Sequence, residues 1–81
     1  MTTKKPAQVQ ARWKRSGGFE PTQFFWDGVI HRVESTGREW EDEHGYHVLC
    51  MIQGGQVYQL TFHLNPAGWT IKPVPGGSTV A

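Results

Sequence analysis

The sequence predicts an all-β domain of about six strands, arranged as a strongly twisted antiparallel meander that closes in part as a small open barrel. Three observations lead to this fold class. Gly54-Gly55 and Asp27-Gly28 each separate two runs of β-forming residues, which is the pattern of a hairpin. No long stretch repeats its apolar residues at the spacing of a helix.

The central hairpin is expected over residues 46–64, where two apolar runs flank Gln53-Gly54-Gly55-Gln56. A glycine pair favours a two-residue turn, because such turns need positive φ. Antiparallel pairing around that turn then sets one register and one core face. The core face carries Met51 opposite Tyr58, Leu49 opposite Leu60 and His47 opposite Phe62. The other face is expected to be half covered and carries Tyr46, Val48, Cys50, Ile52, Val57, Gln59, Thr61 and His63.

The first strand is expected over residues 8–14, where apolar and polar residues alternate around Trp13. The chain then reads as a loop through Ser16-Gly17-Gly18 and Glu20-Pro21, because glycine and proline both interrupt strands. Asp27-Gly28 next predicts a type I′ hairpin over residues 22–33. Its cross-strand pairs are Trp26 with Val29, Phe25 with Ile30 and Phe24 with His31.

Two further strands complete the prediction. Charged residues on both sides of Trp40 indicate an edge strand over residues 38–41, since charges there discourage pairing with another molecule. The last strand is expected from Trp69 to Val74, ending where Pro73 and Pro75 lack an amide hydrogen for the ladder.

These elements define one domain, residues 8–74, with a mobile lead-in at 1–7 and a disordered tail at 75–81. Four Trp, four Phe and two Tyr provide large side chains for a small core. A lone cysteine, Cys50, excludes a disulfide framework and a cysteine metal site, and fits the reducing cytoplasm. No window approaches the ~18 consecutive apolar residues of a membrane span. We therefore expect a cytoplasmic protein without membrane contact.

Histidines and carboxylates near the predicted turn at residues 43–45 raise the question of a metal site or an active site. The predicted register puts His47 and His63 on opposite faces, so we interpret the group as a solvated acidic edge. His31 lies among apolar residues and is interpreted as a core or rim residue. We predict no catalytic residue, no metal, no cofactor and no enzyme activity. The residues considered for a metal site are Glu41, Asp42, Glu43, His44, His47 and His63.

Positive charge is concentrated in the first half of the chain. Residues 1–38 hold seven Lys or Arg against three acids, although the whole chain carries a formal charge of +1. Cations beside exposed rings are typical of sheets that bind single-stranded nucleic acid. The candidate nucleic-acid-binding residues are Arg12, Lys14, Arg15 and Arg32.

Five short segments combine aromatic residues with β-forming neighbours: Arg12-Trp13, Phe25 to Val33, Arg38-Glu39-Trp40, Val57 to Leu60 and Trp69-Thr70-Ile71. Their succession resembles a family of small bacterial β domains of uncharacterised function. The family occurs alone and at the C-termini of proteins related to translesion (Y-family) DNA polymerases, so the resemblance implies a link to DNA metabolism. The acidic run at residues 39–43, with its short turn, departs from the family pattern.

Sparse chemistry and an open sheet face favour a non-enzymatic protein-interaction module. The less apolar face of the central hairpin, with Val48, Cys50, Ile52, Gln59 and Thr61, is the candidate docking surface. The alternative is an accessory single-stranded nucleic-acid-binding domain. Homodimerisation through an unpaired edge is a further expectation, because so small a core gains from shared burial.

Overall fold

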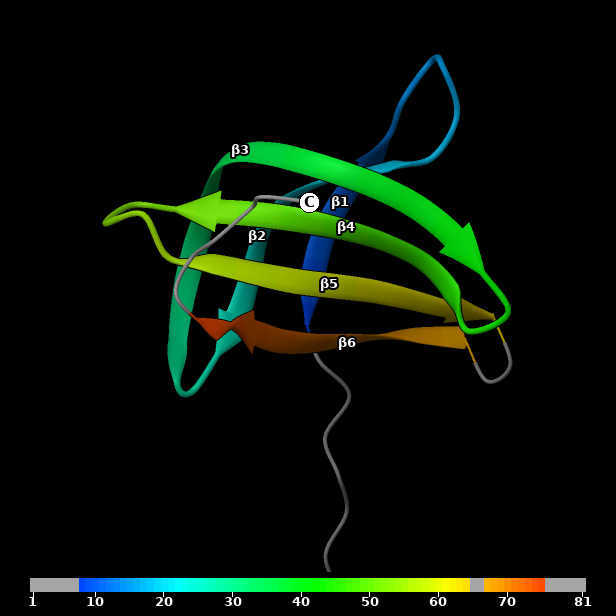
Figure 1. Ribbon diagram of the computed structural model, residues 1–81. Coiled ribbons are helices and arrows are strands. Elements are labelled where there is room, and N and C mark those ends of the chain that lie inside the picture. Colours follow the sequence, from blue (N-terminus) through cyan, green and yellow to red (C-terminus); the bar gives the residue numbers. More distant parts are fainter. Residues whose placement is uncertain (1–7, 65–66, 76–81) are drawn as a thin grey trace, which may run out of the picture.

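Six strands form one antiparallel sheet in the computed structural model, which describes residues 8–64 and 67–75. Each strand pairs with the next along the chain, and the sheet curls through 207° into a half-barrel (Figure 1). The predicted all-β meander is confirmed. The predicted lead-in at 1–7 and all of the predicted tail except Pro75 lie outside the described residues. The strands are β1 (Val9–Trp13), β2 (Phe19–Trp26), β3 (Val29–Asp42), β4 (Gly45–Ile52), β5 (Val57–Leu64) and β6 (Ala67–Val74).

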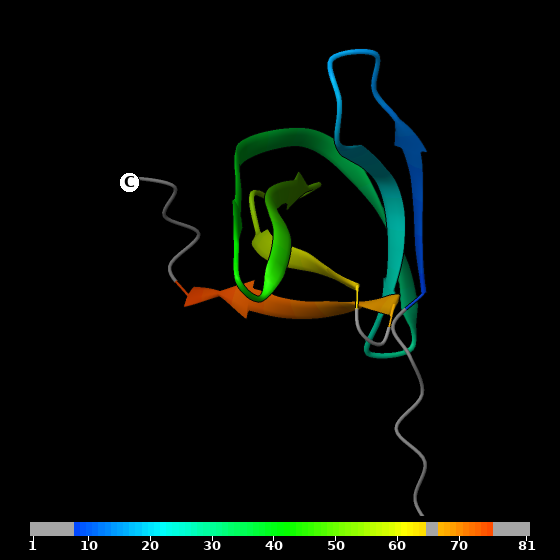
Figure 2. The same ribbon diagram turned by 90° about the vertical axis from the view of Figure 1, so that its right-hand side faces the viewer.

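The curled sheet encloses the core on its concave side. Strands β1 and β2 form one wall, β3 arches over the top, and β4, β5 and β6 complete the other side (Figure 2). The described residues contain no helix with the length and apolar character of a membrane span. The core cluster of buried side chains is Phe24, Val48, Cys50, Ile52, Tyr58 and Leu60.

The predicted Asp27-Gly28 hairpin is confirmed pair by pair. Phe24 lies opposite His31, as expected, and both turn residues have positive φ, 53° at Asp27 and 80° at Gly28. This backbone geometry is that of a type I′ turn. The half-buried His31 ring lies 5.5 Å from the Phe24 ring and 5.9 Å from the Tyr58 ring, so it is a rim residue of the core, as predicted.

The predicted register of the central hairpin is wrong by one residue. The Ile52 N–H donates to the Gln56 carbonyl at 3.0 Å, and the Gly55 N–H donates to the Ile52 carbonyl at 3.1 Å. These bonds enclose a three-residue loop, whereas the prediction assumed two. Met51 consequently pairs with Val57, and Cys50 pairs with Tyr58.

This shift exchanges the two faces of β4, because side chains alternate along a strand. Val48 and Cys50 are fully buried in the core, together with Ile52, and Leu49 and Met51 lie half-buried on the outer face. Thr61 is also buried, at 6% exposure. The docking surface expected on this face therefore does not exist as an exposed surface. The predicted core positions of Tyr58 and Leu60 are confirmed.

Two further expectations differ from the structure. Residues 29–42 form one 14-residue strand, whose ladder to β4 is irregular between Val33 and Ser35 and between Thr36 and Glu39. Residues 35–42 pair only with β4 in the described ladders, which agrees with an edge position. The predicted loop through Pro21 is instead part of β2. Pro21 lies beside an irregularity in the β1–β2 ladder, where Thr22 is the extra residue of β2 and a missing N–H costs little.

Candidate functional site

Five aromatic side chains meet at one end of the half-barrel and are called the end cluster below. The Phe19 ring is central, with its centroid 4.7 Å from Trp13, 4.9 Å from Phe62 and 5.7 Å from Trp69. Tyr46 completes the cluster at 6.2 Å from Phe19. Because β1, β2, β4, β5 and β6 all contribute to this end of the fold, the cluster links both walls of the curled sheet.

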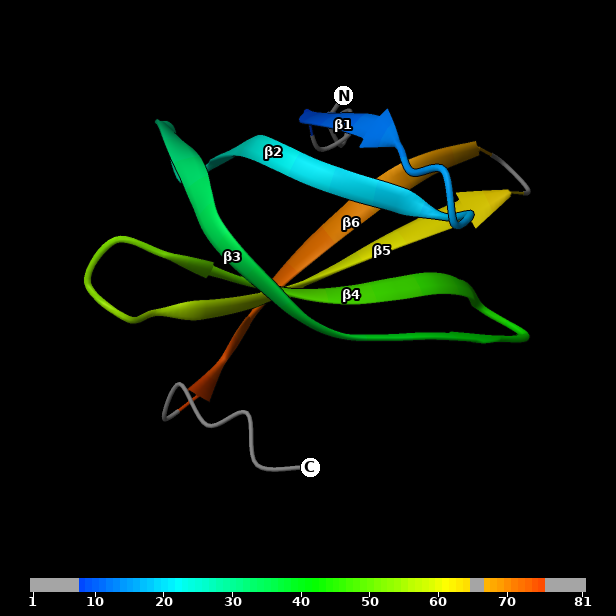
Figure 3. The ribbon, with the colours of Figure 1, turned by 90° about the horizontal axis from the view of Figure 1, so that it is seen from above.

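The end cluster opens into a cleft of about 750 Å³, called the end cleft below. Three segments surround it: the β1–β2 loop, the β3–β4 turn and the C-terminal end of β5. These segments gather at the same end of the molecule when it is viewed from above (Figure 3). The lining residues are Trp13, Ser16, Gly17, Gly18, Phe19, Glu41, Asp42, Glu43, His44, Gly45, Tyr46, Phe62, His63 and Leu64.

Two large apolar side chains of the end cleft face solvent. Trp13 is 68% exposed and Leu64 is 78% exposed. Single exposed apolar residues are common on protein surfaces. Here two of them lie at one concave site beside a floor of aromatic rings, which is the usual composition of a ligand-binding cleft.

A charged network fixes the wall of the cleft that carries Trp13. The Lys14 ammonium donates to one Glu39 oxygen at 2.6 Å, and the Tyr46 hydroxyl donates to the other at 2.6 Å. The Lys14 and Tyr46 hydrogen bonds lower the pKa of Glu39. Desolvation and the neighbouring Glu39 raise the pKa of Tyr46, so its hydroxyl keeps its proton. The end of β1 is thereby tied to β3 and β4.

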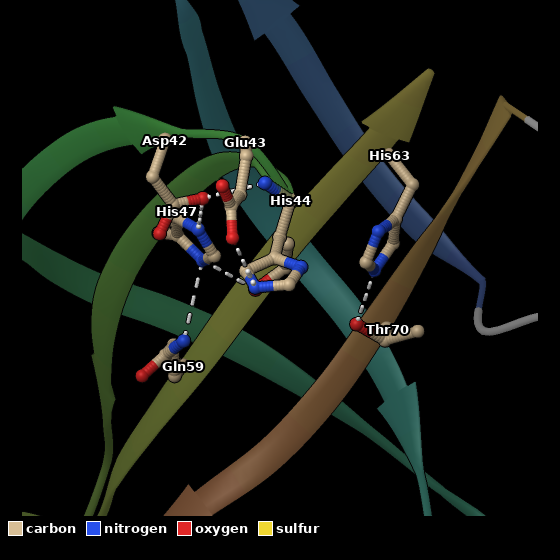
Figure 4. Close-up of polar contacts among 8 residues, drawn as sticks. Asp42, Glu43, His44, His47, Gln59, His63 and Thr70 are labelled. Atoms are coloured by element: carbon tan, nitrogen blue, oxygen red, sulfur yellow. Dashed lines mark hydrogen bonds and ion pairs between the residues drawn. The ribbon is translucent and has the colours of Figure 1, made fainter. Parts of the chain in front are cut away.

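Asp42 fixes the opposite wall. One of its carboxylate oxygens accepts the backbone N–H of His44 at 2.8 Å and lies 2.8 Å from Nε2 of His47 (Figure 4). Since a carboxylate only accepts, the His47 Nε2 atom carries the donated hydrogen. The hydrogen bond from His47, followed by that from the His44 backbone, lowers the pKa of Asp42. The β3–β4 turn is held closed by this single carboxylate.

The His47 ring has polar partners at both nitrogens and an aromatic ring stacked on its face. Its Nδ1 atom lies 2.9 Å from the Thr61 hydroxyl and 3.3 Å from the Gln59 amide nitrogen, and the Trp40 ring stacks on it at 4.9 Å. His47 and Thr61 are each 6% exposed, and neither lines the end cleft. The Asp42, His47 and Thr61 side chains thus have the composition of a catalytic triad without access for a substrate. We interpret these hydrogen bonds as a structural network, called the clamp below, in which Asp42 holds the β3–β4 turn and His47 connects it to Thr61 on β5.

The pH dependence of stability tests this clamp. A lowered pKa in the folded state means that the Asp42 carboxylate stabilises the fold above its unfolded pKa, about 4, and loses that effect as pH falls through the folded value. Asp42→Asn keeps an acceptor oxygen but removes the titration. We expect the wild-type chain to melt higher than the variant at neutral pH and the difference to shrink below about pH 4.

Thermal unfolding followed by circular dichroism, from neutral pH down to about pH 2, measures this difference. Glu39 titrates in both chains, so its contribution cancels in the comparison. A difference in melting temperature that stays constant across the range would contradict the clamp.

The remaining candidates for chemistry are separated in space. His47 and His63 share the outer face, contrary to the prediction, because the register moved by one residue. His63 nevertheless bonds Thr70 on β6 at 3.0 Å, apart from the Asp42 network (Figure 4). Among the described residues no three His, Cys, Asp or Glu side chains gather as metal ligands. Burial raises the pKa of the Cys50 thiol to about 12, so it is protonated at neutral pH.

The four predicted nucleic-acid-binding residues lie on three segments of the chain, and two of them are paired with acids. Arg12 pairs with Glu20 at 3.2 Å, and Lys14 is occupied by Glu39. Arg15 is exposed in the β1–β2 loop, whereas Arg32 is exposed in β3, opposite Gln23. The structure thus spreads these cations over β1, the following loop and β3.

The sequence alone does not indicate Phe19 or Leu64 as site residues, and it places Trp13 in a strand without assigning it to a cleft. Pro21 favours a loop over the segment that contains Phe19. The alternation of Phe19 and Pro21 with polar Glu20 and Thr22 was the available signal of a strand. Leu64 carries no such signal, since its position on the cleft depends on the β5 and β3 ends meeting.

The chain has no match among protein-family models, among curated proteins or among solved structures. The fold and the site therefore define its class by themselves: a small all-β half-barrel with an aromatic cleft at one end.

Proposed function

We propose that this chain is a non-enzymatic protein-interaction module whose end cleft binds a short segment of a partner protein. One observation carries the proposal: an aromatic cluster from both walls of the sheet opens into a cleft of about 750 Å³ with Trp13 68% exposed. A tryptophan buries roughly 150–250 Å² when it is covered, and tryptophans are enriched among the residues that dominate binding energy. Trp13 would be such an anchor.

The two walls of the cleft support this function by their rigidity. Glu39 holds the Trp13 wall through Lys14 and Tyr46, and Asp42 holds the β3–β4 turn through His47. A site whose shape is already fixed loses less entropy when a segment binds. Both networks leave the Trp13 and Leu64 side chains exposed.

Selection of displayed random peptides on the immobilised full chain tests the proposal. We expect selected peptides to bind the wild-type chain at least about tenfold more tightly than Trp13→Ala, because anchor residues contribute about 2 kcal/mol or more. Phe25→Ala is the matched control: its ring is 44% exposed on the outer face, away from the cleft. Peptides that bind Trp13→Ala as well as wild type, or no enrichment at all, would overturn the proposal.

Single-stranded nucleic-acid binding is the second candidate. It is favoured by the exposed Phe25 ring, which shares the outer face of β2 and β3 with Arg32. Such a surface would stack a base and contact a phosphate. Titration of a labelled single-stranded oligonucleotide at low and at physiological salt separates the candidates. A phosphate-binding surface loses affinity steeply with salt and is weakened by Arg32→Ala, whereas the interaction module shows no binding.

A further inference from the structure

We infer that the partner segment presents a lysine or arginine next to a large apolar residue, an inference that rests on the proposed function of the end cleft. The aromatic floor alone would accept any apolar side chain. The charge of the cleft narrows the class of peptide that can bind, because carboxylates line the wall at the β3–β4 turn and an aromatic ring lines the wall at Trp13.

The β3–β4 turn gives the cleft its charge. Glu41, Asp42 and Glu43 all line it, and among the described residues neither a lysine nor an arginine does. Lys14, next to Trp13, is paired with Glu39, and Arg15, next to Ser16, is exposed in the β1–β2 loop without lining the cleft. Asp42 is committed to His44 and His47. The Glu43 side chain lies 3.7 Å from Nε2 of His44 but is 86% exposed, and Glu41 is exposed on β3. Two carboxylates are thus placed to meet a ligand.

The aromatic floor favours the same kind of ligand. A cation over the face of a tryptophan or phenylalanine ring is attracted by the negative potential of the ring, in addition to any carboxylate nearby. Trp13 has a largely exposed ring at the same cleft as Glu41 and Glu43. An ammonium or guanidinium group between them would therefore contact two attractive surfaces. Its aliphatic stem would lie on apolar atoms such as those of Leu64.

The same charges disfavour two other occupants. Phosphates of a nucleic acid would be repelled by Glu41 and Glu43 and would find no lysine or arginine among the described lining residues. An acidic peptide would meet the same repulsion. In a peptide with one cation and one apolar neighbour, the cation would pair with the carboxylates of the β3–β4 turn and the apolar residue would pack on the aromatic floor.

The peptides selected on the full chain test this inference. We expect lysine or arginine beside an apolar residue to be enriched in them, and replacing that lysine with norleucine to weaken binding about tenfold. Glu43→Lys should weaken binding of the same peptide about fivefold or more, and Glu41→Lys is the second variant of this kind. Glu34→Lys makes the same charge change on β3 outside the cleft and should leave binding unchanged.

The outcomes separate the inference from the proposed function. Trp13-dependent peptides without a cationic residue, or equal effects of Glu43→Lys and Glu34→Lys, would overturn the inference and leave the interaction module standing. A selection that yields no Trp13-dependent peptide would overturn both.

Discussion

Gly45→Ala is expected to lower the free energy of unfolding by about 3 kcal/mol. Gly45 begins β4 with φ at 140°, a conformation that side chains disfavour. A Cβ atom there would also overlap the backbone carbonyl oxygen of Phe62 on β5. The Phe62 carbonyl belongs to the backbone of a paired strand, so it cannot move aside cheaply. The cost of backbone strain and the cost of displacing β5 therefore add.

Chemical denaturation of the two chains measures this loss. Gly68→Ala is the matched control, since Gly68 lies in β6 and no atom of the described residues comes within 4 Å of the position of an added Cβ. We expect its effect to stay within about 0.5 kcal/mol. Equal losses for the two substitutions would show that the close approach of Gly45 to Phe62 does not limit the fold.

The contrast between the two glycine-containing hairpins shows what local sequence can specify. Asp27-Gly28 fixes a two-residue type I′ turn, because the aspartate tolerates positive φ and the preceding residues do not. Gly54-Gly55 leaves the choice open, since glycine adopts either sign of φ at every loop position. The structure places both glycines in a three-residue loop at φ of 96° and 85°. The register followed from that loop length and not from the strands.

The end cleft could not be predicted for a different reason. Its floor joins Phe19 to Phe62 and Trp69, residues far apart in sequence, and this contact exists only because the sheet curls. The β1–β2 and β3–β4 ladders are irregular, and such irregularities bend and twist strands in a way that residue propensities do not report. Composition indicated only that aromatic rings would fill a small core, and gave no sign that several of them would line a cleft.

The ion pairs on the surface could not be predicted from the sequence either. Arg12 and Lys14 read as part of a basic surface in the sequence, but each is paired with an acid from another strand. Their partners, Glu20 and Glu39, become neighbours through the sheet topology alone. A count of cations along the chain therefore overstated the positive surface.

Leu60→Ala is expected to destabilise the fold by about 2–5 kcal/mol, the usual range for a buried leucine. Leu60 is fully buried in the core cluster and lies opposite Val48 on β4 and Ile71 on β6, so its removal leaves a cavity bounded by two strands. In a domain of this size the loss corresponds to a fall in melting temperature of about 10 °C or more.

Leu64→Ala is the control for this substitution, because the same residue on the same strand is 78% exposed. We expect its unfolding free energy to change by no more than about 0.5 kcal/mol. Leu64 lines the end cleft, so the same variant should weaken binding of the selected peptides while the fold is intact. Calorimetric melting and peptide titration of both chains therefore separate the two roles of β5. If Leu64→Ala lost as much stability as Leu60→Ala, the exposed rim would be part of the core and could not serve as a binding surface.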